Sequence, residues 1–330
     1  MKPSRKNKVR EPRRFSQAGS SPSFRVLSKY FAATTSTLWI TTSVWFMSVP
    51  VRIVRKDMAI SNHIASQQTD STLHTLSPSR ASDFKVCPQL FKFKAIDRIE
   101  VPPTVHQARG TTAHLALQWL FDLPPQQRTP ETLYELFRKA WVDLRDEEFP
   151  DLFDDVETER RWGIESLEVL SNYFMVEDPT RLEPLDRELD MTEDLGEITI
   201  RGILDRMEEE PDGLVITDYK TGKAPPERYA IPAFFALKIY ALLIRKRTGR
   251  TPVRLRLMYL NGPTVYEIPV NDPQLDATRR KLQALWDAIN RAIARSEFPT
   301  RPGRLCDWCQ YRDICPAFAD EVPPGIVAAS

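Results

Sequence analysis

Hydrophobic and polar positions change their pattern near residue 77 and again near residue 195. Helical spacing of apolar residues appears first in 111–123, where Leu115, Trp119 and Leu123 fall on one face and two prolines follow. A capping signature at Ser79 predicts an earlier helix. The pattern predicts further helical segments at 129–178, which is rich in charge, at 233–249, which ends at a glycine, and at 274–298.

Strand-like patterns interrupt these helices. Residues 195–207 and 213–220 are rich in β-formers, and the polar residues Glu209–Asp212 predict a turn between them. Residues 253–260 and 264–270 predict a second strand pair. The alternation of helical and strand patterns, without an internal repeat, predicts an α/β domain.

Residues 1–76 are different. They begin with a basic, polar stretch, and residues 30–51 then run without a charge for a length that would span a bilayer. Because this run is rich in Thr and Ser, we expect a poorly ordered extension rather than a membrane span, with a start of translation near Met58 as one explanation. Residues 321–330 are expected to form a tail.

Composition narrows the functional classes. With 330 residues and 42% hydrophobic content the chain can bury a large core, and a net charge of +1 gives no global attraction for nucleic acid. Any contact with phosphates must come from a local basic surface. The candidates for such a surface are Arg80, Lys92, Lys94, Arg206, Lys223, Lys238, Arg245, Lys246 and Arg247.

The stretch "GLVITDYKTGKAP" carries the candidate chemistry. Asp218 and Lys220 are two residues apart, so on a strand their side chains share a face. An even-numbered turn before this strand places Asp205 on the same face. Two carboxylates suit a hard divalent cation such as Mg²⁺ or Mn²⁺, and a lysine can stabilise charge on a phosphate. A solvated ion pair at a strand end is the alternative interpretation.

Three short motifs resemble those of RecB-type nucleases in the PD-(D/E)XK superfamily. They are "GTTAH" (110–114), "GILDRM" (202–207) and "ITDYKTGK" (216–223), in the family's order, and the resemblance covers roughly residues 77–320. It implies a restriction-endonuclease-like core, a mixed central sheet flanked by helices, with a helical insertion at about 126–178.

The resemblance also implies roles for individual residues. His114, Asp205 and Asp218 would bind the metal, the carbonyl of Tyr219 would complete the shell, and Lys220 would be the catalytic lysine. A buried helix histidine is the alternative for His114.

Two further positions resemble the family less closely. Glu188 would be an accessory acid, with a plain surface glutamate as the alternative. The family's later helix carries Gln-x-x-x-Tyr: Tyr240 is present and would serve the site unless it is a core aromatic, but Ala236 stands in place of the glutamine.

The four cysteines are Cys87, Cys306, Cys309 and Cys315. Their clustering favours a metal or cluster site in a reducing compartment over disulfides. One lone thiol and a C-terminal trio resemble the iron–sulfur (AddB-like) branch of RecB-type nucleases, which implies a [4Fe–4S] cluster and an iron–sulfur region at 302–318. A zinc site and unrelated buried thiols are the alternatives.

The resulting expectation is a cytoplasmic, metal-dependent DNA nuclease of the exonuclease type that is active in DNA repair or recombination. DNA would be bound without sequence preference, and no small-molecule substrate is implied. The sequence has no G-x-x-x-x-G-K-[ST] loop, so a helicase would be a separate protein. The alternatives are a weakly active or inactive DNA-binding scaffold subunit of a helicase–nuclease complex, and a zinc-stabilised interaction protein.

Overall fold

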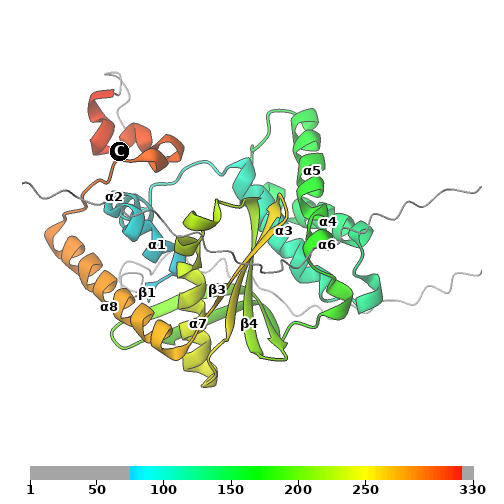
Figure 1. The fold of residues 1–330 in the computed structure, drawn as a ribbon. Helices are drawn as coiled ribbons and strands as arrows, with labels where there is room; N and C mark the ends of the chain where they lie inside the picture. Colours follow the sequence, from blue (N-terminus) through cyan, green and yellow to red (C-terminus); the bar gives the residue numbers. More distant parts are fainter. Residues whose placement is uncertain (1–74, 322–330) are drawn as a thin grey trace, which may run out of the picture. The chain divides into compact units, whose positions relative to one another are not determined.

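A computed structural model describes residues 75–321, which form a six-stranded mixed sheet with helices on both faces (Figure 1). The strands are β1 (Thr75–Leu76), β2 (Asp186–Asp194), β3 (Thr199–Glu210), β4 (Gly213–Lys223), β5 (Arg254–Asn261) and β6 (Thr264–Pro269). The helices are α1 (Pro78–Val86), α2 (Pro88–Phe91), α3 (Val105–Leu120), α4 (Pro130–Glu148), α5 (Val156–Ser171), α6 (Tyr173–Val176), α7 (Phe234–Thr248) and α8 (Asp272–Arg295). The predicted α/β fold with a mixed central sheet is confirmed.

The sheet divides between β3 and β4. These strands pair antiparallel from Glu210 opposite Gly213 to Arg206 opposite Thr217, and the pairing stops there. Beyond this point β4 pairs only with β5, in parallel, while the start of β3 pairs with β2 on one side and β1 on the other. Backbone groups at the division therefore need partners other than the neighbouring strand.

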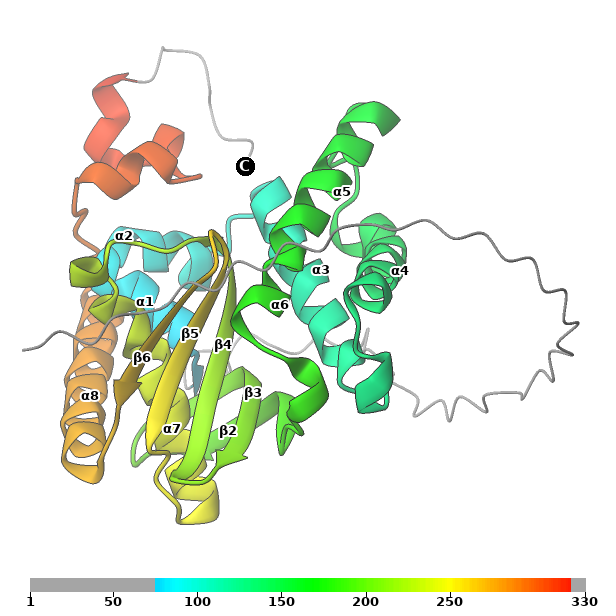
Figure 2. The same ribbon diagram turned by 45° about the vertical axis from the view of Figure 1, so that its right-hand side comes forward.

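Both faces of the sheet are covered (Figure 2). Leu255 and Leu257 of β5 pack into a core with α1, α7 and α8, whereas Met258 and Leu260 pack with α3, α4 and α5. Successive side chains of a strand point to opposite faces, so a strand buried on both sides reads as a continuous apolar run. This is why "LMYL" in β5 lacks polar alternation.

Local signals fix the helix ends. Thr104 caps α3 by accepting from the Gln107 N–H, and the Gln107 side chain accepts from the Thr104 N–H in return. Helix α7 ends at Gly249, as predicted, and this glycine has a left-handed backbone with φ of 73°. Few other residues adopt that conformation without strain.

Several sequence-based expectations need correction. Strand β2 was not predicted, because "DRELDMTED" is charged at most positions and only Met191 of this strand is fully buried. Ser77 caps α1 rather than Ser79, since Pro78 occupies the first helical turn. The turn between β3 and β4 is Pro211–Asp212 alone, because Glu209 and Glu210 continue β3.

The uncharged run at 30–51 and Met58 lie outside the described residues. Between residues 75 and 321, no helix combines the length and the apolar character needed to cross a bilayer. The segment predicted as a helical insertion, 126–178, contains α4, α5 and α6.

Candidate active site and cysteine cavity

The division between β3 and β4 brings the two predicted carboxylates together. The register that pairs Arg206 with Thr217 places Asp205 opposite Asp218, one position beyond the last bonded pair. Asp205 Oδ2 accepts a hydrogen bond of 2.8 Å from the Tyr219 N–H, so this carboxylate satisfies a backbone donor at the division. Directly opposite residues share a face, as the sequence predicted, and the two-residue turn keeps the even count.

Helix α3 brings His114 to the same place. Its Nε2 lies 3.0 Å from the carbonyl oxygen of Tyr219, and because a carbonyl can only accept, Nε2 is the protonated nitrogen. The other ring nitrogen, Nδ1, lies 3.4 Å from Asp205 Oδ2 and 3.7 Å from Glu188 Oε1. A hydrogen bond on the far nitrogen is the usual way in which a protein orients a metal-binding histidine.

Glu188 occupies a strained position on β2. Its neighbours Arg187 and Leu189 pair with Arg206 and Leu204, but Glu188 itself skips its pairing and has φ of 44°. A left-handed glutamate costs on the order of 1–3 kcal/mol, and such strain is concentrated at functional sites. The distorted backbone turns the carboxylate toward His114, so this residue is not a plain surface glutamate.

His114, Glu188 and Asp205 offer ligand atoms that all lie within 4.8 Å of one another, and no other trio between residues 75 and 321 does so. We call these three, with Asp218 and Lys220, the acidic site. The charged residues around Glu188, directly ahead of the hairpin, were the signal for it in the sequence, and the signal was weak.

Asp218 is buried beside Lys220. The Lys220 Nζ lies 2.5 Å from Asp218 Oδ2, so the two side chains form a close ion pair. Burial, followed by the charge of Asp205, raises the pKa of Asp218 to about 6, and Lys220 only partly offsets this. Burial would lower the pKa of Lys220, but Asp218 and Asp205 raise it, so the ammonium stays charged.

The carboxylates around His114 favour a positive charge at this position. Burial would lower its pKa, but Asp205, Glu188 and Asp218 raise it well above the usual value. Because Nε2 already carries a proton, the additional positive charge belongs at Nδ1, which faces Asp205 and Glu188. The carboxylates of Glu188 and Asp205, with the oriented imidazole of His114, are a donor set that fits a divalent metal ion, and Asp218 lies beside them.

Tyr240 is both packed and near the acidic site. A Cβ added to Gly202 would lie 2.8 Å from the Tyr240 ring and 3.0 Å from Pro78, so the glycine allows this close approach. Burial, followed by the charges of Asp205 and Asp218, raises the pKa of the Tyr240 hydroxyl. Ala236, one helical turn earlier, is half-buried.

Arg206 is not available to phosphates, contrary to the prediction. Its side chain is 1% exposed and makes two hydrogen bonds to Glu177, of 2.5 and 2.7 Å. It also bonds to Glu208 and donates to the Tyr219 hydroxyl at 2.6 Å. This buried network fixes Tyr219, whose carbonyl orients His114. The sequence did not reveal it because Glu177 is 29 residues away.

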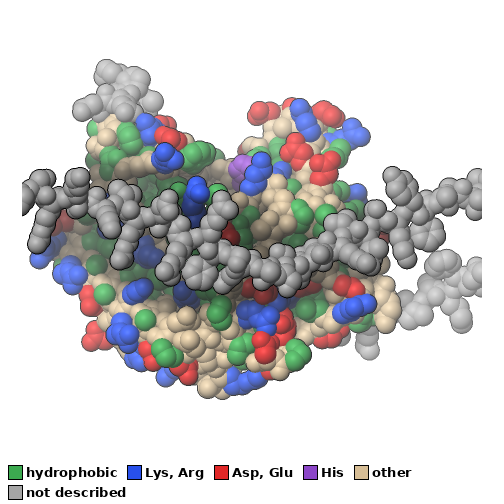
Figure 3. Space-filling model, viewed as in Figure 1, with side chains coloured by type: hydrophobic (Ala, Val, Ile, Leu, Met, Phe, Trp, Pro, Cys, Tyr) green, Lys and Arg blue, Asp and Glu red, His purple; other side chains and the backbone are tan. Residues whose placement is uncertain are grey.

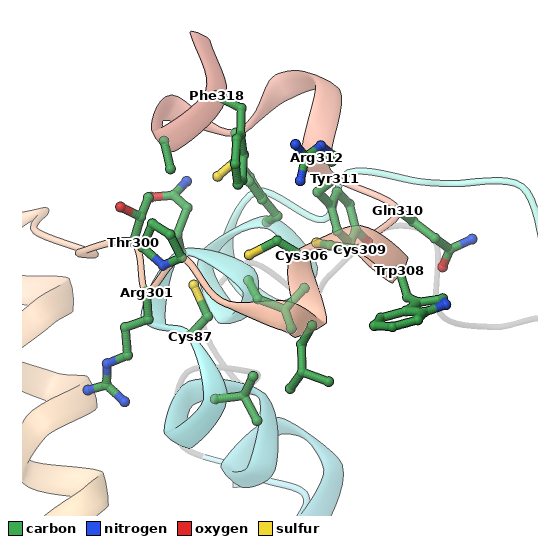
Figure 4. Close-up of a pocket in the computed structure, with 18 of the residues that line it drawn as sticks. Cys87, Thr300, Arg301, Cys306, Trp308, Cys309, Gln310, Tyr311, Arg312 and Phe318 are labelled. Carbon is green, nitrogen blue, oxygen red and sulfur yellow. The ribbon is translucent and has the colours of Figure 1, made fainter. Parts of the chain in front are cut away.

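The four cysteines line one cavity of about 310 Å³ (Figure 4). Cys87 lies between α1 and α2, whereas the other three lie on or beside the short 3₁₀ turns Arg304–Trp308 and Arg312–Ile314. Burial, followed by the neighbouring thiols, raises the pKa of Cys315. The tertiary structure therefore brings the lone cysteine and the trio together, as the sequence predicted.

Few protein contacts hold this cavity. The Tyr311 ring stacks on Phe93 with centroids 5.4 Å apart, and its hydroxyl donates to the carbonyl of Ile99. Gln310 donates to the carbonyl of Pro102. Leu305 and Trp308 are 65% and 77% exposed, so the segment has little core of its own.

Comparison with known proteins shows the family of the chain. A family model described as the PD-(D/E)XK nuclease superfamily matches residues 75–316. This match spans well over half of the chain, and the chain belongs to this superfamily. Its core is the mixed sheet flanked by helices described above. No curated protein matches the chain.

Two solved structures show weaker similarity. One, named "putative exonuclease" and from Eubacterium rectale, is 16% identical with a TM-score of 0.46, covering 75% of this chain and 92% of that one. The other, protein VC1899 from Vibrio cholerae, is 17% identical with a TM-score of 0.20, covering 69% of this chain and 57% of that one. These values are too low to add to the family assignment.

Proposed function

We propose that this nuclease is a metal-dependent DNA exonuclease of the RecB type that acts in DNA repair or recombination. The observation that carries the proposal is the convergence of His114, Glu188 and Asp205 where β3 and β4 separate. Asp218 and Lys220 adjoin this trio on the next strand. Carboxylates, an imidazole and an ammonium around one point suit hydrolysis of a phosphodiester.

The residues divide the chemistry among them. His114, Asp205, Asp218 and Glu188 would hold Mg²⁺ or Mn²⁺, which when bound polarises the phosphate and lowers the pKa of water. Lys220 stays charged beside Asp218 and is placed to stabilise negative charge that develops on the phosphate. Tyr219 orients His114 through its carbonyl, and its predicted role as a metal ligand stays a prediction.

The cysteine cavity is the observation that supports a [4Fe–4S] cluster. All four cysteines of the chain line this one cavity, although Cys87 is far from the other three in the sequence. Four thiolates are the ligand set of such a cluster. Cys87, Cys306, Cys309 and Cys315 would hold it, in a reducing, cytoplasmic environment.

The first experiment measures Mn²⁺-dependent cleavage of linear single- and double-stranded DNA by anaerobically purified protein. Lys220→Ala should lose cleavage, whereas Lys139→Ala, which removes an exposed lysine of α4, should keep it. If folded, brown wild-type protein cuts neither substrate, the nuclease proposal fails in favour of a DNA-binding scaffold subunit. An iron-free, colourless preparation that binds zinc would overturn the cluster.

A further inference from the structure

Cations from distant parts of the sequence gather where α1, α7 and α8 meet. Lys85, Lys281 and Arg301 line a cleft of about 460 Å³ with the aromatic rings of Phe84 and Phe235. The Lys85 Nζ lies 3.6 Å from the centroid of the Phe235 ring. Arg301 donates to the carbonyl of Lys85 at 2.6 Å. We call this surface the basic cleft.

The charges of the basic cleft are not neutralised by the protein. Between residues 75 and 321, no ion pair joins Lys85, Lys281 or Arg301 to an acid. The basic run predicted to contact DNA behaves differently, since Arg245 pairs with Asp272 and Asp276. Asp83, also on α1, is bound to Lys94. The cleft therefore presents positive charge for an external anion.

Repulsion between the cations of the basic cleft supports the conclusion that their charges are not neutralised. Burial, followed by the charges of Lys281 and Lys238, lowers the pKa of Lys85. Lys238 of α7 is thus a fourth cation close to the cleft. Figure 3 shows Lys and Arg side chains on the part of this face that α1 and α8 occupy in Figure 1.

One residue joins the basic cleft to the cysteine cavity. Arg301 lines both the basic cleft and the cysteine cavity, and Figure 4 shows its side chain directed away from Cys87 and Cys306. Phe235, on the other side, belongs to the first turn of α7, the helix that carries Tyr240. The basic cleft therefore borders the cysteine cavity through Arg301 and the start of α7 through Phe235.

We propose that the basic cleft binds the phosphate backbone of the DNA strand on the cysteine-cavity side of the acidic site. This inference rests on the proposed function and adds a second contact region to it. Three cations hold successive phosphates, while the half-buried Phe235 offers apolar surface to sugars or bases. None of these groups reads sequence, because phosphate contacts position the strand without distinguishing bases.

The test measures binding separately from cleavage. Full-length, cluster-loaded protein carrying Lys220→Ala is titrated against a long single-stranded oligonucleotide, and fluorescence anisotropy gives Kd over a range of salt concentrations. Each lost phosphate contact should lower the slope of log affinity against log salt by about 0.7, which at 0.1 M salt is roughly five-fold in Kd. Lys281→Gln should show this loss, and Lys281→Glu a larger one.

Arg280→Glu is the matched control, because Arg280 is the neighbouring exposed residue of α8 and does not line the cleft. Equal losses in Lys281→Glu and Arg280→Glu, or wild-type Kd and salt slope in both, would overturn the inference. Both side chains are exposed, and thermal unfolding confirms that each variant folds. If wild-type protein cuts DNA but Lys281→Glu binds DNA with the wild-type Kd, the proposal for the basic cleft is wrong and the nuclease proposal stands. If wild-type protein does not cut DNA but Lys281→Glu still binds more weakly than Arg280→Glu, only the nuclease proposal is wrong.

Discussion

The acidic site and the cysteine cavity are built in opposite ways. The acidic site has its ligands on two central strands, the distorted strand β2 and the sixteen-residue helix α3, all held by the main cores. The cysteine cavity takes three of its four thiols from short turns beyond the last helix, where Leu305 and Trp308 are exposed. The fold itself holds the acidic site in place. The cysteine cavity has few protein contacts of its own, so its order would depend on the proposed cluster.

This difference predicts different consequences for loss of the bound group. In the acidic site, the Arg206 network and the Tyr219 backbone hold the side chains in place through protein contacts alone. Charge repulsion between Asp205 and Asp218 even works against folding. In the cysteine cavity, the binding energy of the proposed cluster would contribute to the free energy of folding, because few protein contacts hold the described segment that carries the trio.

The largest expected effect separates catalysis from stability at Asp218. Asp218→Asn should reduce cleavage on the order of 10³-fold, because the charged partner of Lys220 and a carboxylate proposed to bind the metal are lost. Its Tm should be equal to or above that of the wild type, since a buried carboxylate beside Asp205 becomes neutral. Cleavage rates and thermal unfolding check this. A large fall in Tm would mean that Asp218 is structural.

The second largest effect is expected at Cys87, where a substitution should reduce stability. Cys87→Ser should lose the brown colour and lower Tm by on the order of 10 °C. Limited proteolysis should then cut first in 300–321, because that segment has few contacts of its own. Ser82→Ala, a nearby substitution outside the cavity, is the control. If an iron-free Cys87→Ser protein had the Tm of the wild type, the cysteine cavity would not depend on a bound cluster for its stability.

The third effect tests the network behind the acidic site through pH. Burial would raise the pKa of Glu177, but Arg206 lowers it below its usual value. The stabilisation is therefore present above the unfolded pKa, about 4.3, and is lost as pH falls through the folded value. Glu177→Gln should cost roughly 3 kcal/mol at neutral pH, because it leaves Arg206 buried without that charge. Denaturant unfolding should show the difference shrinking in acid.

The control for this prediction is Glu183→Gln, which removes an exposed partner of the buried Arg128. It should cost less at neutral pH than Glu177→Gln. A Glu177→Gln deficit that persists unchanged in acid would show that shape rather than charge matters.

The smallest effect concerns the amide missing from α7. Ala236→Gln restores the expected side chain one turn before Tyr240, and it should raise cleavage roughly two- to ten-fold, the value of one hydrogen bond. Steady-state kinetics on linear DNA measure it. An unchanged or lower rate would mean that position 236 does not reach the substrate.

The sequence identified much of the acidic site because its motifs are local. "GILDRM" and "ITDYKTGK" form one hairpin, and the period of two fixes which residues share a face once the turn length is even. Glu188 was harder to identify from the sequence, because its position depends on a left-handed backbone that no sequence pattern predicts. Arg206 was misjudged as a surface residue, since an arginine becomes buried only when distant acids such as Glu177 enclose it.

By itself, the sequence determined the α/β class, the order of most helices and strands, the facing carboxylates and the pairing of Cys87 with the distant trio. The first three follow from periodicity and turn chemistry, which are local properties of a chain, whereas the grouping of Cys87 with the trio was implied by the resemblance to iron–sulfur nucleases. Only the tertiary structure decided where β3 and β4 separate, how His114 is oriented and which cations form the basic cleft. Those features arise from contacts between segments up to about two hundred residues apart, such as Arg301 with Lys85, and depend on packing that no local pattern encodes.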